Sequence, residues 1–291
     1  MKYPRILAAI RSAKWAVRPE TLQAIRDVLS ARLQGRITDT LPAYAGAISA
    51  DAGGDGGDCE EEPFEFVAPG IARVELHGII GKNLSGMEMM CGGCDIDDVE
   101  ENLIAALADS TVTGVILDID SPGGTVGGVA DFAARISQLE QESGKSVIAY
   151  ASGQCCSAAY WIACGCTGIV AGSSSDIGSI GVYIALVDES ENWADEGYKL
   201  VLVKAGDYKA AGYPGSKITP EQVAIWQDDV DFIYGQFTDA VRAARPGIAT
   251  ETMQGQTFYG PRALTALLVD DIQSLDELAQ DMAATPIPAG L

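Results

Sequence analysis

The chain has 291 residues, of which 47% are apolar, so it can bury a substantial core, and disordered or fibrous architectures are excluded. Its 19 Lys and Arg side chains against 41 Asp and Glu give a net charge of −22, which argues against nucleic acid and anionic lipid as main partners. The sequence has one histidine, His77, so any mechanism that needs two histidines is also excluded.

The N-terminal segment is basic although the whole chain is acidic. Residues 1–36 carry eight basic and two acidic side chains. Apolar residues at helical spacing predict an amphipathic helix over residues 19–34, within a basic helical arm over residues 1–40. Such an arm suggests docking on the acidic body or on an acidic partner, and a solvated helical face explains the charges equally well. Residues 41–69, rich in Gly, Ala and acidic side chains, are predicted to be a linker.

The sequence shows neither a secretory signal nor a membrane span. The apolar run over residues 6–10 is too short for a signal core. Residues 146–175 lack charge, but Gln154 and several Gly and Ser residues interrupt them, so we interpret the run as buried core. Seven cysteines are an odd number and are interpreted as reduced thiols, which favours a cytoplasmic location.

Strand and helix patterns alternate through a body that we place at residues 70–280, followed by a tail over residues 281–291. The predicted strands cover residues 71–80, 114–119, 146–151, 168–171, 181–187 and 199–203, and the predicted helices cover residues 96–107, 126–141, 157–163, 220–244 and 261–268. Several of these strands are apolar on both faces, as in a parallel sheet covered by helices on both sides. The pattern therefore predicts an α/β fold.

The loop Ser121-Pro122-Gly123-Gly124 follows one buried strand and precedes a helix. Its glycines can turn backbone N–H groups into a cleft at the carboxyl end of the strand, where they would hold an oxyanion. The same residues also form ordinary turns, so this loop alone does not decide between the two roles.

Ser157 begins a predicted helix and is flanked by small residues, which is a suitable place for a nucleophile. The alternative is a serine that caps the helix N-terminus. A serine nucleophile needs a base, and because His77 lies on the first predicted strand, lysine is the remaining option. A lysine amine must be desolvated to act as a base, and the uncharged surroundings of Ser157 offer such an environment. Lys209 lies in a loop of small residues, but composition alone does not single it out among the lysines.

Four ordered motifs carry a family resemblance: Asp120-Ser121-Pro122-Gly123-Gly124, Ser157-Ala158-Ala159-Tyr160, Gly178-Ser179-Ile180-Gly181-Val182 and Gly206-Asp207-Tyr208-Lys209. In order and spacing they resemble the signal peptide peptidase A family of Ser-Lys peptidases. The resemblance covers roughly residues 71–278. It implies an α/β fold of the Clp protease and crotonase kind, built from repeated β-β-α units.

The resemblance also implies roles for single residues. Ser157 is implied as the nucleophile, Lys209 as the general base and Ser179 as the hydroxyl that orients the lysine. The N–H groups of Gly124 and Ala158 are implied as the oxyanion hole. Gly123 and Ser121 are implied to bind substrate. No cofactor and no metal are implied.

The implied activity is that of a serine endopeptidase acting on a protein or peptide substrate. In the family, active sites form within rings of subunits, and the lysine can reach the serine of a neighbour. The chain is similar to soluble prophage members that mature capsids, which suggests scaffold or capsid proteins as partners. Two alternatives remain open: an inactive capsid or scaffold interaction module, and an acyl-CoA enzyme of the crotonase kind, for which paired glutamates beside the glycine loop are missing.

Two further patterns are interpreted as structural. The pairs Cys91/Cys94 and Cys164/Cys166 are too far apart in sequence for a zinc ribbon, so buried thiols are favoured over a metal site. Asp118 and Asp120 alternate along a strand beside the glycine loop, and we expect them to cap backbone N–H groups.

Overall fold

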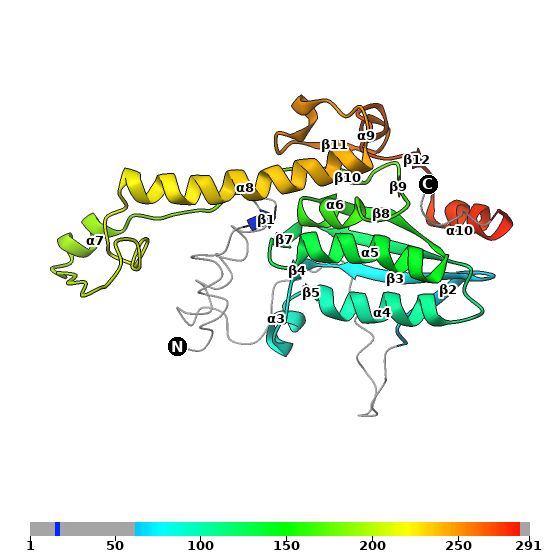
Figure 1. Cartoon of the computed structure of the whole chain (residues 1–291), viewed down its shortest axis with the longest axis horizontal. Coiled ribbons are helices and arrows are strands. Elements are labelled where there is room, and N and C mark those ends of the chain that lie inside the picture. Colours follow the sequence, from blue (N-terminus) through cyan, green and yellow to red (C-terminus); the bar gives the residue numbers. More distant parts are fainter. Residues whose placement is uncertain (1–14, 18–61, 286–291) are drawn as a thin grey trace.

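The computed structural model describes residues 15–17 and 62–285 (Figure 1). Within these residues the main sheet has eight strands, with the order β11-β10-β8-β6-β3-β2 and with β9 joining β12 to β8. Its strands are β2 (Glu65–Ala68), β3 (Ile71–His77), β6 (Gly114–Ser121), β8 (Ser146–Cys156), β9 (Gly168–Ala171), β10 (Asp176–Gly178), β11 (Thr257–Tyr259) and β12 (Asp271–Ile272). The central strands β3, β6, β8 and β10 run parallel.

A smaller sheet lies beside the main one. Its order over the described residues is β1-β7-β4-β5, formed by β1 (Trp15–Val17), β7 (Gly123–Thr125), β4 (Ile79–Gly81) and β5 (Gly93–Asp95). The helices are α3 (Gly86–Met90), α4 (Ile96–Ala108), α5 (Val129–Ser143), α6 (Ala158–Ala163), α7 (Ser190–Asp195), α8 (Pro220–Ala244), α9 (Gly260–Thr265) and α10 (Leu275–Ala284), with a 3-10 turn at Thr250–Met253.

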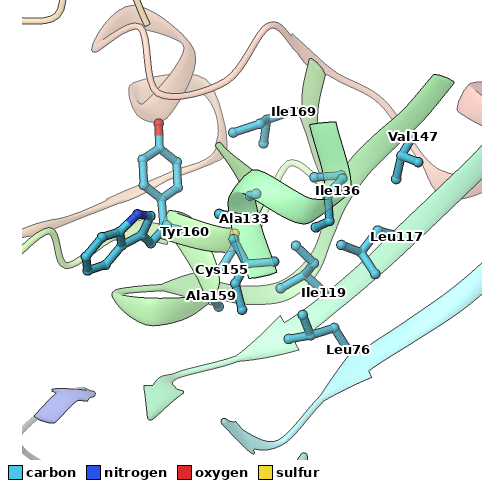
Figure 2. Packing of buried hydrophobic residues seen from close by; sticks show 14 of the residues in the cluster. Leu76, Leu117, Ile119, Ala133, Ile136, Val147, Cys155, Ala159, Tyr160 and Ile169 are labelled. Atoms are coloured by element: carbon cyan, nitrogen blue, oxygen red, sulfur yellow. The ribbon is translucent and has the colours of Figure 1, made fainter. Parts of the chain in front are cut away.

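The core lies on both faces of the main sheet. On one face, α4, α5 and α6 pack their apolar residues against β3, β6 and β8; Leu76, Leu117 and Ile136 belong to this cluster (Figure 2). On the other face, Leu278 and Met282 of α10 pack against the same strands. Because helices cover both faces, β6 and β8 carry continuous buried apolar runs, such as Val115-Ile116-Leu117, in place of the alternation of a half-exposed sheet.

The predicted fold class is confirmed. The segment β6-β7 with α5 follows the β-β-α pattern expected for the Clp protease and crotonase fold, and β3-β4 with α4 follows it with α3 and β5 inserted before the helix. Helix α8 matches its predicted range because Pro220 occupies its first turn and Thr219 forms a capping box with Gln222. Helix α5 starts at Val129, three residues later than predicted, since Gly128 before it has a φ of 83°.

Several predicted strand boundaries were wrong. The strand expected over residues 71–80 is divided into β3 and β4 at Gly78, whose φ of +102° breaks the extended backbone. Residues 181–187 and 199–203 were also expected to be strands, but neither forms one. Both runs are apolar, yet a strand also needs a hydrogen-bonding neighbour. Val203, in the second run, is 97% exposed and lies away from both sheets.

The structure places residues 188–232 outside the packed body, whereas Ile233 packs against the core, and we call residues 188–232 the projecting arm. The arm comprises α7, the irregular segment after it and the first part of α8, and it extends away from the sheet (Figure 1). The second part of α8 returns to the body, where Phe237 stacks on Trp161 of α6 with ring centroids 4.7 Å apart. The arm is therefore anchored at the end of α8 that lies nearer the core.

Part of the N-terminal segment is described. The helix expected over residues 19–34, and most of the expected linker, lie outside the described residues. Trp15–Val17, within the arm that was expected to be helical, instead form strand β1. Within the described part of the chain, no helix combines the length and the apolar character that crossing a membrane requires.

Candidate active site

Three parallel strands of the main sheet end beside one another. Ser121 at the end of β6 is paired with Cys155 of β8, and Cys156 of β8 is paired with Gly178 of β10. The carboxyl ends of parallel strands meet at one edge of a sheet, which is the usual position of a binding site in an α/β fold. This edge carries the candidate site.

Ser157 occupies a strained turn between β8 and α6. Its φ of 58° and ψ of −118° lie outside the regions that non-glycine residues normally adopt. Its N–H donates to the carbonyl of Gly178 at 2.7 Å, its Oγ donates to the carbonyl of Gly181 at 3.5 Å, and it is 1% exposed. Ser157 occupies the N-cap position of α6, as the alternative interpretation expected, but its side chain makes no capping hydrogen bond. Strain of this kind, about 1–3 kcal/mol, is concentrated at functional sites.

Ser179 lies at the neighbouring strand end. It follows Gly178 as Ser157 follows Cys156, so the pairing of β8 with β10 brings the two serines to the same edge. Its φ of 51° is also positive, and its N–H donates to the carbonyl of Gln256 at 2.8 Å. The two predicted serines are therefore placed together by backbone pairing.

The loop Ser121-Pro122-Gly123-Gly124, called the glycine loop, lies at the same edge of the sheet. Gly123 has a φ of +97°, and its N–H donates to the Oγ of the buried Ser121 at 3.2 Å. Gly124 pairs with Ile80 of β4, and a Cβ at Gly124 would lie 1.9 Å from the carbonyl oxygen of Ile80. Strand β7 packs against α6, whose first residue is Ala158. The predicted oxyanion-hole residues therefore lie on two elements in contact.

Lys209 lies on the projecting arm and is exposed. The nearby Gly212 lies against Trp226 in the second turn of α8, whereas Phe237, eleven residues later, stacks on Trp161 of α6. Eleven residues span about 16 Å along a helix. Figure 1 likewise shows the segment before α8 at the outer end of this helix, away from α6. A single chain does not bring Lys209 to Ser157.

Cys155, two residues before Ser157, is unsuited to nucleophilic attack. Burial raises the pKa of the Cys155 thiol well above its usual value, and the neighbouring Cys156 adds to this effect. A thiol in this state carries little thiolate, the form that reacts. Among the described residues, no group of His, Cys, Asp and Glu side chains is arranged to hold a metal ion.

The histidine and the two aspartates lie on β3 and β6. His77 Nε2 is 3.6 Å from Asp118 Oδ2, and Arg73 Nη1 is also 3.6 Å from that oxygen. Asp120 accepts the N–H of Gln154 at 2.8 Å, so its predicted capping role is confirmed. Asp118 forms ion pairs instead, because the buried carboxylate lies between two side chains that can carry positive charge.

Some contacts at this edge were not predicted. The acceptors for Ser157 are the backbone carbonyls of Gly178 and Gly181, which no side-chain pattern reveals. The pairing of β1 with β7 was also missed. Its available signal was the short apolar run Trp15-Ala16-Val17 between Lys14 and Arg18.

Comparison with known proteins identifies relatives of this chain. Residues 139–286 match the model of peptidase family S49. The chain is 32% identical to the head-tail preconnector protein GP5 of Enterobacteria phage P21, over 75% of this chain and 43% of that protein. It is 31% identical to a putative protease of Synechocystis, over 74% of this chain and 73% of the relative. It is 26% identical to the capsid assembly protease C of Escherichia phage lambda, over 80% of this chain and 53% of the relative.

The chain thus spans about half the length of the two phage relatives. The matched region begins within α5 and includes Ser157, Ser179 and Lys209, whereas the glycine loop precedes it. The family model covers half of the chain, and the similarity to the Synechocystis relative extends over most of both proteins. The chain belongs to peptidase family S49.

Proposed function

We propose that this protein is a serine endopeptidase in which Ser157 of one copy and Lys209 of a neighbouring copy form the catalytic dyad. The observation that carries the proposal is the strained turn at Ser157, buried at a strand end beside Ser179 and the glycine loop. A serine on a sharp turn from strand to helix has its hydroxyl fixed at the end of a sheet, the arrangement that nucleophilic serines use on other α/β folds. Membership in family S49 supports the same chemistry.

Each residue has a defined part in the reaction. The neutral amine of Lys209 accepts the proton of Ser157 Oγ while the oxygen attacks the peptide carbonyl. The N–H groups of Gly124 and Ala158 donate to the resulting oxyanion. The protonated lysine then gives its proton to the leaving amine, and an acyl-enzyme remains. A water molecule, deprotonated by the same lysine, hydrolyses the ester and regenerates Ser157. Ser179 positions the lysine, and Ser121 and Gly123 hold the substrate backbone.

The properties of the projecting arm support a base from a neighbouring copy. Tyr198, Val203 and Phe232 on the arm are each at least 65% exposed in one chain. Large exposed apolar side chains on one projecting segment favour association with another surface. A lysine side chain that enters the buried edge around Ser157 leaves water, which disfavours its charged form and favours the neutral amine that a base must be. A homo-oligomeric ring would supply both the surface and the lysine.

For the substrate, we propose a scaffold or capsid protein of a phage or prophage, cleaved in the cytoplasm of the host cell where heads assemble. The support comes from the relatives, since one is a head-tail preconnector protein and another a capsid assembly protease. The net charge of −22 fits a protein substrate better than a nucleic acid. The proposal requires no cofactor.

Mixing of two inactive variants tests the dyad. Ser157→Ala and Lys209→Ala are purified separately, and hydrolysis of candidate head proteins is measured for each and for an equal mixture after disassembly and reassembly. We expect each variant to be inactive and the mixture to regain about a quarter of wild-type activity, because random assembly pairs an intact serine with an intact lysine at that share of sites.

Three results decide the test. A mixture that stays inactive beside an active wild type places serine and lysine in the same chain. Full activity of either single variant removes the dyad. A serine-directed fluorophosphonate, mapped by mass spectrometry to Ser157 in the wild type, separates a peptidase from an inactive capsid-binding module, which would not react. The new termini of the cleaved head protein identify the scissile bonds.

A further inference from the structure

Strand β1 lies on the glycine loop that the reaction uses. Trp15, Ala16 and Val17 pair antiparallel with Thr125, Gly124 and Gly123 of β7 (Figure 1). The opposite edge of β7 is occupied by β4. Strand β1 therefore fills the edge of β7 that an extended peptide could otherwise join by adding a strand.

The C-terminal end of β1 lies at Gly123, two residues after Ser121, whose partner Cys155 lies two residues before the nucleophile Ser157. Because the pairing is antiparallel, the chain passes from Thr125 at Trp15 to Gly123 at Val17. Strand β7 packs against α6, the helix that begins directly after Ser157. Val17 is 2% exposed, so the protein buries an aliphatic side chain at this end of β1.

We propose that residues 15–17 are a built-in occupant of the substrate site, which competes with the extended peptide that is to be cleaved. The inference rests on the proposed function in so far as it takes the β7 edge as the substrate site. It also defines the class of substrate: an extended segment with an aliphatic side chain at the position that Val17 now fills. Such a segment binds by replacing β1 on β7.

The connection to the body is compatible with an occupant from the same chain. Residues 18–61 join β1 to the body, and a chain of this length reaches across a domain. The strand itself has three residues, so it makes few backbone hydrogen bonds, and a longer substrate strand can replace it. Because β1 is tethered to the body, its effective concentration at β7 is high. It therefore occupies β7 unless a substrate strand binds there with more backbone hydrogen bonds.

A reversible crosslink tests the proposal in the full-length chain. Trp15 and Thr125 are direct partners in an antiparallel pair, where Cα atoms lie about 4.5–5.5 Å apart, within the range of a disulfide. The variant Trp15→Cys with Thr125→Cys is prepared in a Cys91→Ser background, since Cys91 is exposed. The control carries Thr125→Cys alone in the same background. Both are compared oxidised and reduced.

Two readouts are taken from each form. The first is binding of a fluorescein-labelled synthetic peptide that copies residues 12–21, measured by anisotropy in a Ser157→Ala version, which needs no catalysis. The second is hydrolysis of a head-protein substrate with Ser157 intact. We expect an intramolecular crosslink that weakens peptide binding and hydrolysis at least about tenfold, with recovery on reduction. The control should not change.

Other outcomes overturn the proposal. Equal peptide binding by the oxidised and reduced forms, or no binding by either, shows that β1 does not block a peptide site. A crosslink between two copies on a non-reducing gel places the strand of one copy on another and refutes an occupant from the same chain. Absence of any crosslink refutes the pairing. If no form hydrolyses the substrate but the crosslink still controls peptide binding, the proposed peptidase function is refuted, whereas the proposal that β1 occupies a peptide site is supported.

A second variant avoids the disulfide. Val17→Asp puts an unpaired carboxylate at a buried position, which should expel β1, whereas Val17→Ile keeps an aliphatic group there. We expect Val17→Asp to react with the fluorophosphonate at least about threefold faster than the wild type, and Val17→Ile to react at the wild-type rate. Equal rates for all three proteins contradict an occupant of the site.

Discussion

Ser157 and Lys209 lie in regions of opposite character. Ser157 is 1% exposed, at an edge where three paired strands and two backbone acceptors fix its position. Lys209 lies on the projecting arm, where Val203 is 97% exposed and no strand of the described residues supports the chain. The body completes its own core, and the arm leaves its apolar groups uncovered. On the proposed assembly, folding of one chain builds the half of the site around Ser157, and association with a second copy supplies the half that contains Lys209.

The largest expected effect separates two lysines of the arm. Lys209→Ala should lower hydrolysis by at least about 10³-fold, because removing the base of a catalytic dyad removes most of the rate acceleration. Lys204, whose amine donates to the carbonyl of Asp207, is the matched control, and Lys204→Ala should stay within about threefold of the wild type. Steady-state kinetics on one substrate measures both. Equal losses in the two variants would point to damage of the arm rather than to a base.

Two phenylalanines of α8 compare the body with the arm. Phe237 is fully buried against Trp161, and Phe237→Ala should lower the free energy of unfolding by about 3–5 kcal/mol. Phe232 is 68% exposed, and Phe232→Ala should change the unfolding free energy of the monomer by less than about 0.5 kcal/mol while it weakens assembly. Urea unfolding and sedimentation velocity measure the two quantities. An intact assembly in Phe232→Ala contradicts a role of this face in association.

A smaller effect is expected at the glycine loop. Gly124→Ala puts a methyl group against the carbonyl of Ile80, which should displace β7 and lower hydrolysis about 10²-fold through a misplaced oxyanion donor. Gly127 has open space around a Cβ, so Gly127→Ala is the control and should retain nearly full activity. Kinetics and thermal unfolding of the two variants separate a catalytic defect from a loss of fold.

The smallest effect concerns pH. Burial lowers the pKa of His77, but its hydrogen bond to Asp118 and the charges of Asp118 and Glu75 raise it more, so the net shift is upward. Protonated His77 therefore stabilises the fold at pH values below its ordinary pKa, and this contribution is lost as the pH rises through the raised value. Relative to the wild type, His77→Gln should be less stable at about pH 5.5 and equally stable at about pH 9. Urea unfolding at both pH values decides this.

The difference between body and arm also explains what sequence reasoning could predict. Runs such as Val115-Ile116-Leu117 predicted the central strands because burial on both faces leaves an unmistakable apolar pattern. Helix α8 was predicted from Pro220 and its periodicity. The apolar run over residues 199–203 misled the same method, since it faces solvent in one chain and has no strand beside it. A run of apolar residues indicates burial, but it does not distinguish burial within one chain from burial against another molecule.

At the site, side chains were easier to predict than backbone. Ser157 and Ser179 were named from motifs, and the pairing of β8 with β10 puts them at the same edge. The carbonyls of Gly178 and Gly181 that receive Ser157 could not be inferred, because a backbone acceptor leaves no signature in a sequence. The pairing of Trp15 with Thr125 joins residues more than a hundred positions apart, beyond what local periodicity records.

The position of Lys209 at the outer end of the arm has a consequence for timing. On the proposed assembly, a newly synthesised chain in dilute solution holds nucleophile and base apart and is dormant without needing a separate inhibitor. Proteolysis then starts when the subunit concentration is high enough for association, so at low protein concentration the rate should rise more steeply than the first power of concentration. The activity of such an enzyme would depend on its own concentration.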